Sequence, residues 1–214
     1  MKVGTDAVLL GAWASLPQTG QVLDVGCGCG VISLMAAQRA PLAQVTGIDI
    51  HAPSVIQAKE NAEHSPFSNV CFLEGDFLLE PFPTLFDTII SNPPYHTESL
   101  ISPEAARAAA RNAAFLSFPS FVRRASELLT GGGTLQVILP AAASAQFHGE
   151  CASNLLSLVR ITYVHTTKNK APKRVLMEFV KGPSSVVEKN EIILQEDDGK
   201  RTKSYSSLCK DYYL

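Results

Sequence analysis

Hydrophobic residues along this chain fall into short apolar runs that alternate with segments of helical periodicity. The runs predict strands over residues 21–25, 44–50, 70–73, 86–91 and 134–139. The segments between them predict helices over residues 31–39, from position 53 onward, twice within 97–129, and over 142–158. Strands that alternate with helices are typical of βαβ units, so a mainly parallel sheet is expected.

The last part of the chain follows a different pattern. Apolar runs at residues 161–165 and 175–180 are separated only by the polar segment 167–174, and this close spacing indicates an antiparallel hairpin. A shorter apolar run at 192–194 and a final helix over 204–213 follow. The whole pattern predicts an α/β fold with a mostly parallel sheet.

Length and composition favour one domain spanning residues 1–214, because 214 residues with 46% hydrophobic content suffice for one well-filled core and not for two. The formal net charge of −2 provides no global positive field, so nucleic acid would have to meet a local basic patch. No stretch approaches the ~18 consecutive apolar residues of a membrane span, and the opening residues form no signal peptide. We therefore expect a cytoplasmic protein that does not bind membranes.

The cysteines give no indication of a metal site. They form no CxxC pair of the kind that zinc sites use. The five thiols are those of Cys27, Cys29, Cys71, Cys151 and Cys209. A CxC pair inside a glycine turn is more simply explained by a need for small residues, so we expect free thiols and no metal.

The first motif with chemical content is DVGCGCG at residues 24–30, where an apolar strand runs into alternating glycines. Gly26, Gly28 and Gly30 allow positive φ angles and let a ligand approach the backbone without a Cβ in the way. Asp49 ends the next strand, where a carboxylate can accept hydrogen bonds from both hydroxyls of a ribose. A glycine-rich turn alone is weak evidence, because α/β proteins of other function also carry one.

The spacing of this motif distinguishes between two adenosine-containing ligands. It is GxGxG rather than the GxGxxG of dinucleotide sites, in which a helix N-terminus receives a pyrophosphate. Asp24 would repel phosphates but would suit the ammonium group of a methionine moiety. The residues therefore favour S-adenosylmethionine over NAD.

An acidic turn over residues 74–77 follows the third predicted strand. Asp76 could accept a hydrogen bond from an adenine amino group, and Phe77 could lie against the ring. An ordinary polar turn explains the same residues equally well.

The tetrapeptide Asn92-Pro93-Pro94-Tyr95 follows the fourth predicted strand. The lone pair of an amide or aryl amine nitrogen is delocalised, so such a nitrogen is a poor nucleophile. The side-chain carbonyl of Asn92 and the backbone carbonyl of Pro93 can each accept a hydrogen bond from one N–H group of a planar amine. These hydrogen bonds favour the tetrahedral geometry in which the nitrogen lone pair attacks the methyl sulfonium. The prolines hold that backbone rigid, and Tyr95 can stack on a base.

A simple turn is the alternative explanation of this tetrapeptide, because Asn favours turns and the following proline favours an extended residue before it. Its position at the carboxyl end of a central strand, where α/β sheets place their ligands, favours the catalytic interpretation.

Together these motifs resemble those of class I methyltransferases that act on amino nitrogens. The resemblance covers roughly residues 20–180 and rests on segments 24–30, 75–76 and 92–95 and on Asp49. The opening MKVGTDAVLLGAW, the stretch APKRVL at 171–176 and the tail from residue 205 are similar to those of the bacterial tRNA1(Val) adenine-N6 methyltransferases. That family modifies the adenine just 3′ of the anticodon, at position 37.

The resemblance implies a Rossmann-like fold whose seven-stranded, mostly parallel sheet has an antiparallel last strand. It implies S-adenosylmethionine as the cofactor and the anticodon loop of a tRNA as the partner. The implied cofactor contacts come from Thr5, Asp24, Gly26, Asp49, Asp76 and Asn92. Members of the family usually carry residues ahead of the KVGTD segment, so we expect a short N-terminal extension to be missing here.

The densest group of basic residues that could meet RNA phosphates lies in the loop 168–174. Its members are Lys168, Lys170, Lys173 and Arg174. We expect a monomer or a weak dimer that presents this loop to the tRNA.

Other functions are open on the residues alone. The same tetrapeptide could serve methylation of a protein glutamine amide, a guanine N2 of rRNA or a DNA adenine. A glutamine enzyme would be expected to carry a helical N-terminal domain, for which the chain leaves no room. A module that binds the cofactor or RNA without catalysis is the alternative from another class.

Overall fold

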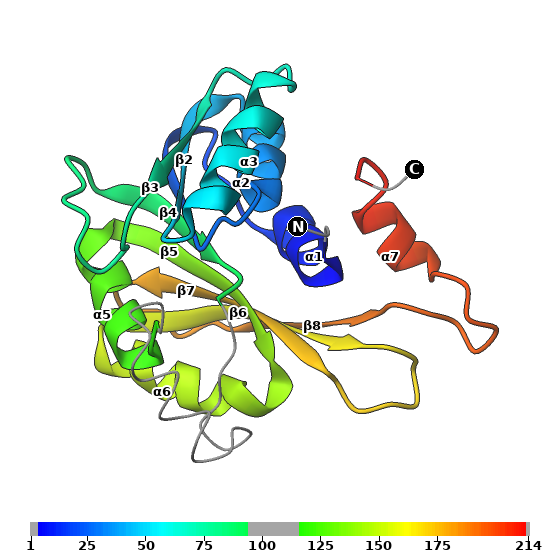
Figure 1. Cartoon of the computed structure of the whole chain (residues 1–214). Helices are drawn as coiled ribbons and strands as arrows, with labels where there is room; N and C mark the ends of the chain where they lie inside the picture. The colour runs from blue at the N-terminus through cyan, green and yellow to red at the C-terminus, as the bar shows by residue number, and fades with distance from the viewer. Residues whose placement is uncertain (1–3, 94–115, 213–214) are drawn as a thin grey trace, which may run out of the picture.

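A single eight-stranded sheet runs through the computed structural model, which describes residues 4–93 and 116–212 (Figure 1). The spatial order of the strands is β3-β2-β1-β4-β5-β7-β6-β8. Their bounds are β1 Thr19–Val25, β2 Leu42–Asp49, β3 Val70–Glu74, β4 Phe86–Ser91, β5 Leu129–Pro140, β6 Leu156–His165, β7 Arg174–Lys181 and β8 Glu188–Ile193.

The pairing of the strands confirms the predicted fold class. Strands β1 to β5 pair in parallel, whereas β7 is antiparallel to both of its neighbours, β5 and β6. The predicted hairpin is therefore the β6–β7 pair. The sheet has one strand more than the seven expected, because the apolar run at 192–194 belongs largely to β8, which pairs in parallel with β6 and forms the edge.

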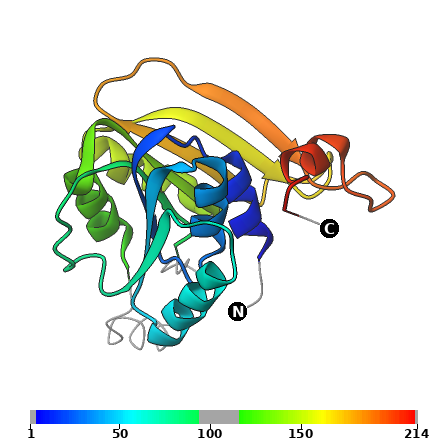
Figure 2. The same cartoon turned by 90° about the horizontal axis from the view of Figure 1, so that it is seen from above.

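Helices cover both faces of the sheet (Figure 2). On one face lie α1 Thr5–Trp13, α2 Val31–Arg39 and α3 Ala52–Glu63, and on the other α5 Phe118–Leu128 and α6 Ser144–Ser153. Alternating strand residues feed the two cores: Leu23 packs with α5 and α6, whereas Val22 packs with α1 and α2. No helix in the described parts of the chain is long and apolar enough to cross a membrane.

Two helical predictions differ from the structure. The helix expected over 142–158 ends at Ser153, because Leu155 adopts a φ of 61° and turns the chain back into the sheet at Leu156. Helix α1 was missed, because residues 8–13 are buried and show no polar face. Of the two helices expected within 97–129, only the second, α5, falls on described residues.

Helix α7, Lys203–Leu208, returns the tail to the body of the protein. Thr202 begins it by accepting a hydrogen bond from the backbone N–H of Tyr205 on its own hydroxyl. Tyr205 and Cys209 are buried in the same apolar cluster as α1. The described tail is thus packed against α1, and both views show these two helices side by side (Figures 1 and 2).

A polar network fixes the last turn of α1 to the sheet. The indole N–H of Trp13 donates to the Thr162 hydroxyl over 2.9 Å. The Arg160 guanidinium lies 3.6 Å from the centre of the Trp13 ring and donates to its backbone carbonyl and to Glu178. Because Glu178 is buried, the ion pair neutralises a carboxylate that would be costly to bury alone.

We expect Thr162→Val to destabilise the fold by about 1–3 kcal/mol, because the buried indole N–H of Trp13 would lose its acceptor while the side-chain volume stays the same. Urea denaturation measures the effect. Thr19→Val is the control, since Thr19 is exposed at the start of β1 and should change stability by less than about 0.5 kcal/mol. Equal effects of the two substitutions would contradict the assigned role of the Trp13–Thr162 bond.

Candidate active site

The two motifs meet at the carboxyl edge of the sheet, because β1 and β4 are neighbours. Val25 and Ser91, the last residues of these strands, are register partners. The Ser91 hydroxyl donates to the Val25 carbonyl over 2.8 Å. Gly26 and Asn92 therefore leave the sheet side by side, at the edge where α/β proteins bind their ligands.

The glycine turn has the backbone that the sequence predicts. Gly26, Gly28 and Gly30 have φ angles of 71°, 54° and 85°. A Cβ at Gly26 would meet nothing within 4 Å, whereas one at Gly30 would lie 2.7 Å from the ring of Phe72. Gly30 is therefore needed for packing as well as for its φ angle, and Gly26 leaves open space that a ligand can occupy.

Asp49 is fixed at the end of β2 by backbone donors. One carboxylate oxygen accepts from the Gly28 N–H and the other from the His51 N–H, both over 2.8 Å. Each oxygen keeps further lone pairs for another donor. The carboxylate is only partly buried, so it lies oriented beside the glycine turn and accessible to a ligand.

Asp24 is the most unusual group of the site. It is 1% exposed, one carboxyl oxygen accepts from the Ser33 hydroxyl over 2.6 Å, and the other has no partner among the described residues. Burial raises the pKa of this carboxyl to about 7, against the hydrogen bonds from Ser33, and the charge of Asp49 adds to the rise. A buried carboxyl with an unused oxygen is suited to a cationic ligand.

Ser33 is a residue of this candidate site that sequence reasoning missed. It lies in the first turn of α2 and is fully buried, so the pattern resembles an ordinary apolar helix face. Its spacing of nine residues from Asp24, across the glycine turn, is the signal that could have pointed to it.

The cysteines of the turn behave as small filling residues. Cys27 and Cys29 are buried, and burial, with smaller contributions from Asp24 and Asp49, raises the pKa of the Cys27 thiol far above its usual range. Within residues 4–93 and 116–212, no three His, Cys, Asp or Glu side chains gather where they could hold a metal ion.

Asp76 lies next to Asp49 across the ends of two strands. The Gly75 N–H donates to the Asp49 carbonyl, and the Asp76 side chain accepts from the Leu78 N–H, which folds residues 75–80 into a turn. Phe77 is only 5% exposed, and its ring packs against Phe121. Its proposed contact with adenine stays a prediction that must use this small accessible area.

The remaining predicted residues lie as follows. Asn92 is partly buried and Pro93 is buried directly after β4, while Pro94 and Tyr95 fall outside the described residues. Thr5 is exposed at the start of α1. Lys168, Lys170 and Lys173 are exposed in the β6–β7 hairpin loop, and Arg174 begins β7 half-buried.

A cavity of about 330 Å³ lies at the opposite, amino edge of the sheet and contains none of the predicted site residues. It is lined by Ser15, Leu16, Pro17, Asp87, Thr88, Thr130, Gly131, Gly132, Gly133 and Thr134.

The carboxyl edge fits S-adenosylmethionine better than a dinucleotide. Asp24, Asp49 and Asp76 place three carboxyl groups around the glycine turn, and segments 24–30, 49–51, 74–77 and 92–93 contain no Lys or Arg. Such a site repels a pyrophosphate and suits a ligand that carries an ammonium, a sulfonium and a ribose.

Comparisons with known proteins agree with this chemistry. The family model of the methyltransferase small domain matches residues 3–170. The tRNA1(Val) (adenine(37)-N6)-methyltransferases of Phocaeicola vulgatus and Bacteroides thetaiotaomicron are 39% and 34% identical, over 100% of this chain and 91% of each relative. The chain belongs to this family of methyltransferases. S-adenosylmethionine is accordingly its cofactor.

Solved structures confirm the Rossmann-like methyltransferase fold. A predicted O-methyltransferase from Agrobacterium tumefaciens has a TM-score of 0.77 at 22% identity and covers 96% of both chains. A putative class I S-adenosylmethionine-dependent methyltransferase from Listeria monocytogenes has a TM-score of 0.62 at 17% identity, over 86% of this methyltransferase and 62% of the other chain.

Asp24 gives the methyltransferase a specific pH dependence. The folded carboxyl keeps its proton up to about pH 7, whereas the unfolded chain loses it near the ordinary pKa of 3.8. The folded state therefore binds the extra proton between these values, and stability falls as pH rises through this window. One such proton corresponds to about 1.4 kcal/mol per pH unit.

We expect Asp24→Asn to remove this slope in the ligand-free protein. The difference in unfolding free energy between variant and wild type should therefore shift in favour of the variant from pH 5 to pH 8, as measured by urea denaturation. The exposed Asp198 supplies the control Asp198→Asn, for which no comparable shift is expected. An Asp24→Asn difference that is the same at both pH values would argue against the raised pKa.

Proposed function

We propose that this protein is a single methyltransferase domain that transfers a methyl group to the N6 amine of an adenine in tRNA, at position 37 of tRNA1(Val), in the cytoplasm. The juxtaposition of Asn92 with the glycine turn, through the Ser91–Val25 hydrogen bond, carries the proposal. The full-length similarity to relatives that bear this name supports the choice of substrate.

The tetrapeptide positions the amine that receives the methyl group. S-adenosylmethionine supplies, when bound, an electrophilic methyl group on a positively charged sulfonium. The Asn92 side-chain carbonyl and the Pro93 backbone carbonyl accept hydrogen bonds from the two N–H groups of the adenine amine and so orient its lone pair. Pro93 and Pro94 hold these acceptors in place, and Tyr95 stacks on the base after it has left the loop.

The cofactor roles that we propose follow the positions of the acidic residues. Asp49 accepts hydrogen bonds from the ribose hydroxyls, and Asp76 accepts one from the adenine amino group of the cofactor. Asp24 faces the methionine ammonium. We also propose cofactor contacts from Thr5, Gly26, Gly28, Gly30, Phe77 and Asn92.

The tRNA partner would meet the protein on the β6–β7 hairpin loop. Because β7 begins opposite Pro140, at the carboxyl end of β5, the loop 166–173 projects beyond the edge that holds Asn92. With a formal net charge of −2, the protein needs such a local cluster to hold the phosphates of an anticodon loop. We propose that it acts as a monomer or a weak dimer.

Asn92→Ala tests the catalytic proposal. Without the side-chain acceptor, the rate of transfer at saturating substrate should fall about 100- to 1000-fold, while affinity for S-adenosylhomocysteine should fall far less. The assay uses labelled S-adenosylmethionine and tRNA from cells that lack the activity, followed by nucleoside mass spectrometry. The exposed Asn190 of β8 supplies the control Asn190→Ala. Undiminished transfer by Asn92→Ala would show that the assigned mechanism is wrong.

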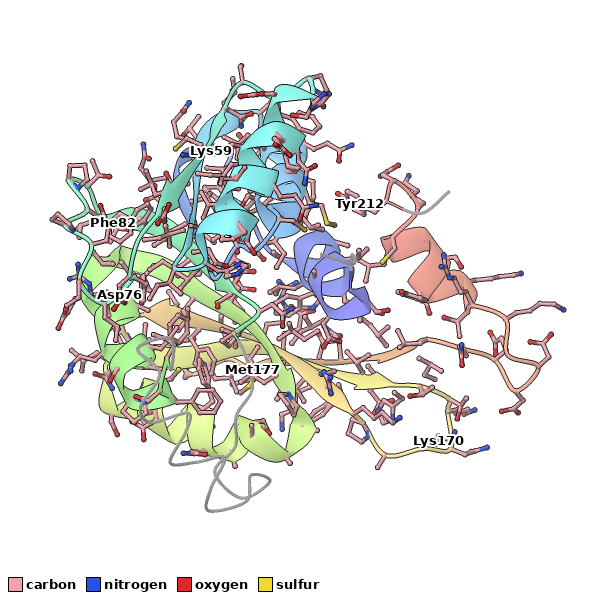
Figure 3. The ribbon with its side chains drawn as sticks, viewed as in Figure 1. Lys59, Asp76, Phe82, Lys170, Met177 and Tyr212 are labelled. Carbon is pink, nitrogen blue, oxygen red and sulfur yellow. The ribbon has the colours of Figure 1, made fainter. Side chains whose placement is uncertain are left out.

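The loop lysines make a separate prediction about RNA affinity. Replacing Lys168, Lys170 and Lys173 by Ala should weaken tRNA binding. A plot of the logarithm of the association constant against the logarithm of the salt concentration should become less steep by up to about 2. The affinity for S-adenosylhomocysteine should not change. Lys59→Ala is the control, because Lys59 lies on α3, far from Lys170 (Figure 3). Similar losses of tRNA affinity per lysine in both proteins would exclude a specific role of the loop.

A further inference from the structure

Helix α1 runs from the active edge of the sheet toward the opposite edge. Asp6, in its first turn, bonds to Arg174, the first residue of β7, whose register partner Pro140 ends β5. Trp13, in its last turn, bonds to Thr162, which lies deeper in the sheet. The start of α1 therefore lies at the same edge as Gly26 and Asn92.

The Asp6–Arg174 contact joins two parts of the protein that are 168 residues apart in sequence. The Nε of Arg174 donates to Oδ2 of Asp6 over 2.8 Å, with the side chains 34% and 27% exposed. The carboxylate also lies at the positive end of the helix dipole, where a negative charge is favoured. This pair therefore links the start of α1 to the base of the hairpin.

Arg174 is also hydrogen-bonded to the hairpin loop that precedes it. One of its terminal nitrogens donates to the Lys173 carbonyl over 3.2 Å, and that carbonyl also accepts from the Ala141 N–H just beyond β5. Lys168, Lys170 and Lys173 are exposed on this loop. A phosphate held by the loop would thus lie next to the arginine that holds α1.

The two ends of α1 are held differently. Residues 8–13 are buried, and the Trp13 network fixes the last turn. Gly4 and Thr5 are exposed, and Gly4 provides no side-chain cap. The ion pair at Asp6 therefore adds a polar contact with the sheet to a first turn that packs on the core through Ala7 and Val8.

We propose that the Asp6–Arg174 ion pair positions the first turn of α1 against the cofactor and thereby couples tRNA binding on the hairpin loop to cofactor affinity. The coupling to tRNA rests on the proposed function, whereas the role of the ion pair in positioning the first turn of α1 does not. RNA bound to the loop would restrict the motion of Arg174, and Arg174 holds Asp6, so RNA and cofactor should each raise the affinity of the other by the same factor.

The first experiment needs no RNA. Calorimetry measures the affinity of the full chain for S-adenosylhomocysteine in wild type, Asp6→Asn and Asp6→Glu. We expect Asp6→Asn to lose about threefold in affinity, in the range of a partly exposed ion pair, and Asp6→Glu, which keeps the charge, to recover most of it. The control Asp198→Asn removes an exposed carboxylate that also pairs at 2.8 Å, with Lys200, and should change nothing.

The second experiment repeats these titrations with saturating unmodified tRNA1(Val) transcript. In wild type the transcript should raise S-adenosylhomocysteine affinity about fivefold, and this factor should fall to about one in both Asp6→Asn and Arg174→Gln. The double variant should behave like either single variant, because each alone already breaks the pair. Thermal unfolding of every variant verifies that the protein is folded.

The outcomes separate the two proposals. Unchanged cofactor affinity in folded Asp6→Asn, or equal losses in Asp6→Asn and Asp6→Glu, overturns the positioning role. A wild-type factor of one, with the transcript bound, overturns the coupling. A wild-type protein that does not bind the transcript contradicts the proposed function instead, and the RNA-free titrations still decide the role of the ion pair.

Discussion

The parallel pairing of β1 with β4 is the constraint on which the site depends. It makes Val25 and Ser91 neighbours at the carboxyl edge, and the Ser91 hydroxyl bonds the two strand ends together. A shift of this register by two residues, which would keep the same faces buried, would move Asn92 about 7 Å along the strand relative to the glycine turn. The chemistry proposed for the protein tolerates no such displacement, because methyl transfer requires the two reacting groups to be adjacent.

Within this site, Asp24 and Asp49 differ in burial and therefore suit different groups of the ligand. Asp49 is oriented by two backbone N–H groups and stays accessible, whereas Asp24 is buried with one oxygen unused and a raised pKa. An accessible carboxylate suits hydroxyl groups, and a buried one gains most from a cation. Segments 24–30, 49–51, 74–77 and 92–93 contain no Lys or Arg, which disfavours binding of a phosphate group here. A cluster of basic residues lies instead on the β6–β7 hairpin, where we propose that RNA binds.

Local pattern was sufficient for most of the fold and of the motifs. The central strands and the glycine turn follow from apolar runs and from the φ angles that only glycine adopts easily, and both motifs lie where parallel strands end. Contacts between distant segments could not be predicted in this way. In the sequence, Ser33 resembles a core residue, and β8 has too few apolar residues to be predicted as a strand. The Asp6–Arg174 pair depends on how α1 lies on the sheet.

A ternary structure with S-adenosylhomocysteine and the anticodon stem-loop of tRNA1(Val) would show whether Asn92 holds the adenine amine beside the cofactor. We expect the nucleoside on the glycine turn, with its ribose on Asp49 and with the flipped adenine amine hydrogen-bonded to the Asn92 side chain. A nucleoside in the cavity at the amino edge, or an adenine amine that makes no contact with Asn92, would show that the assigned site is wrong.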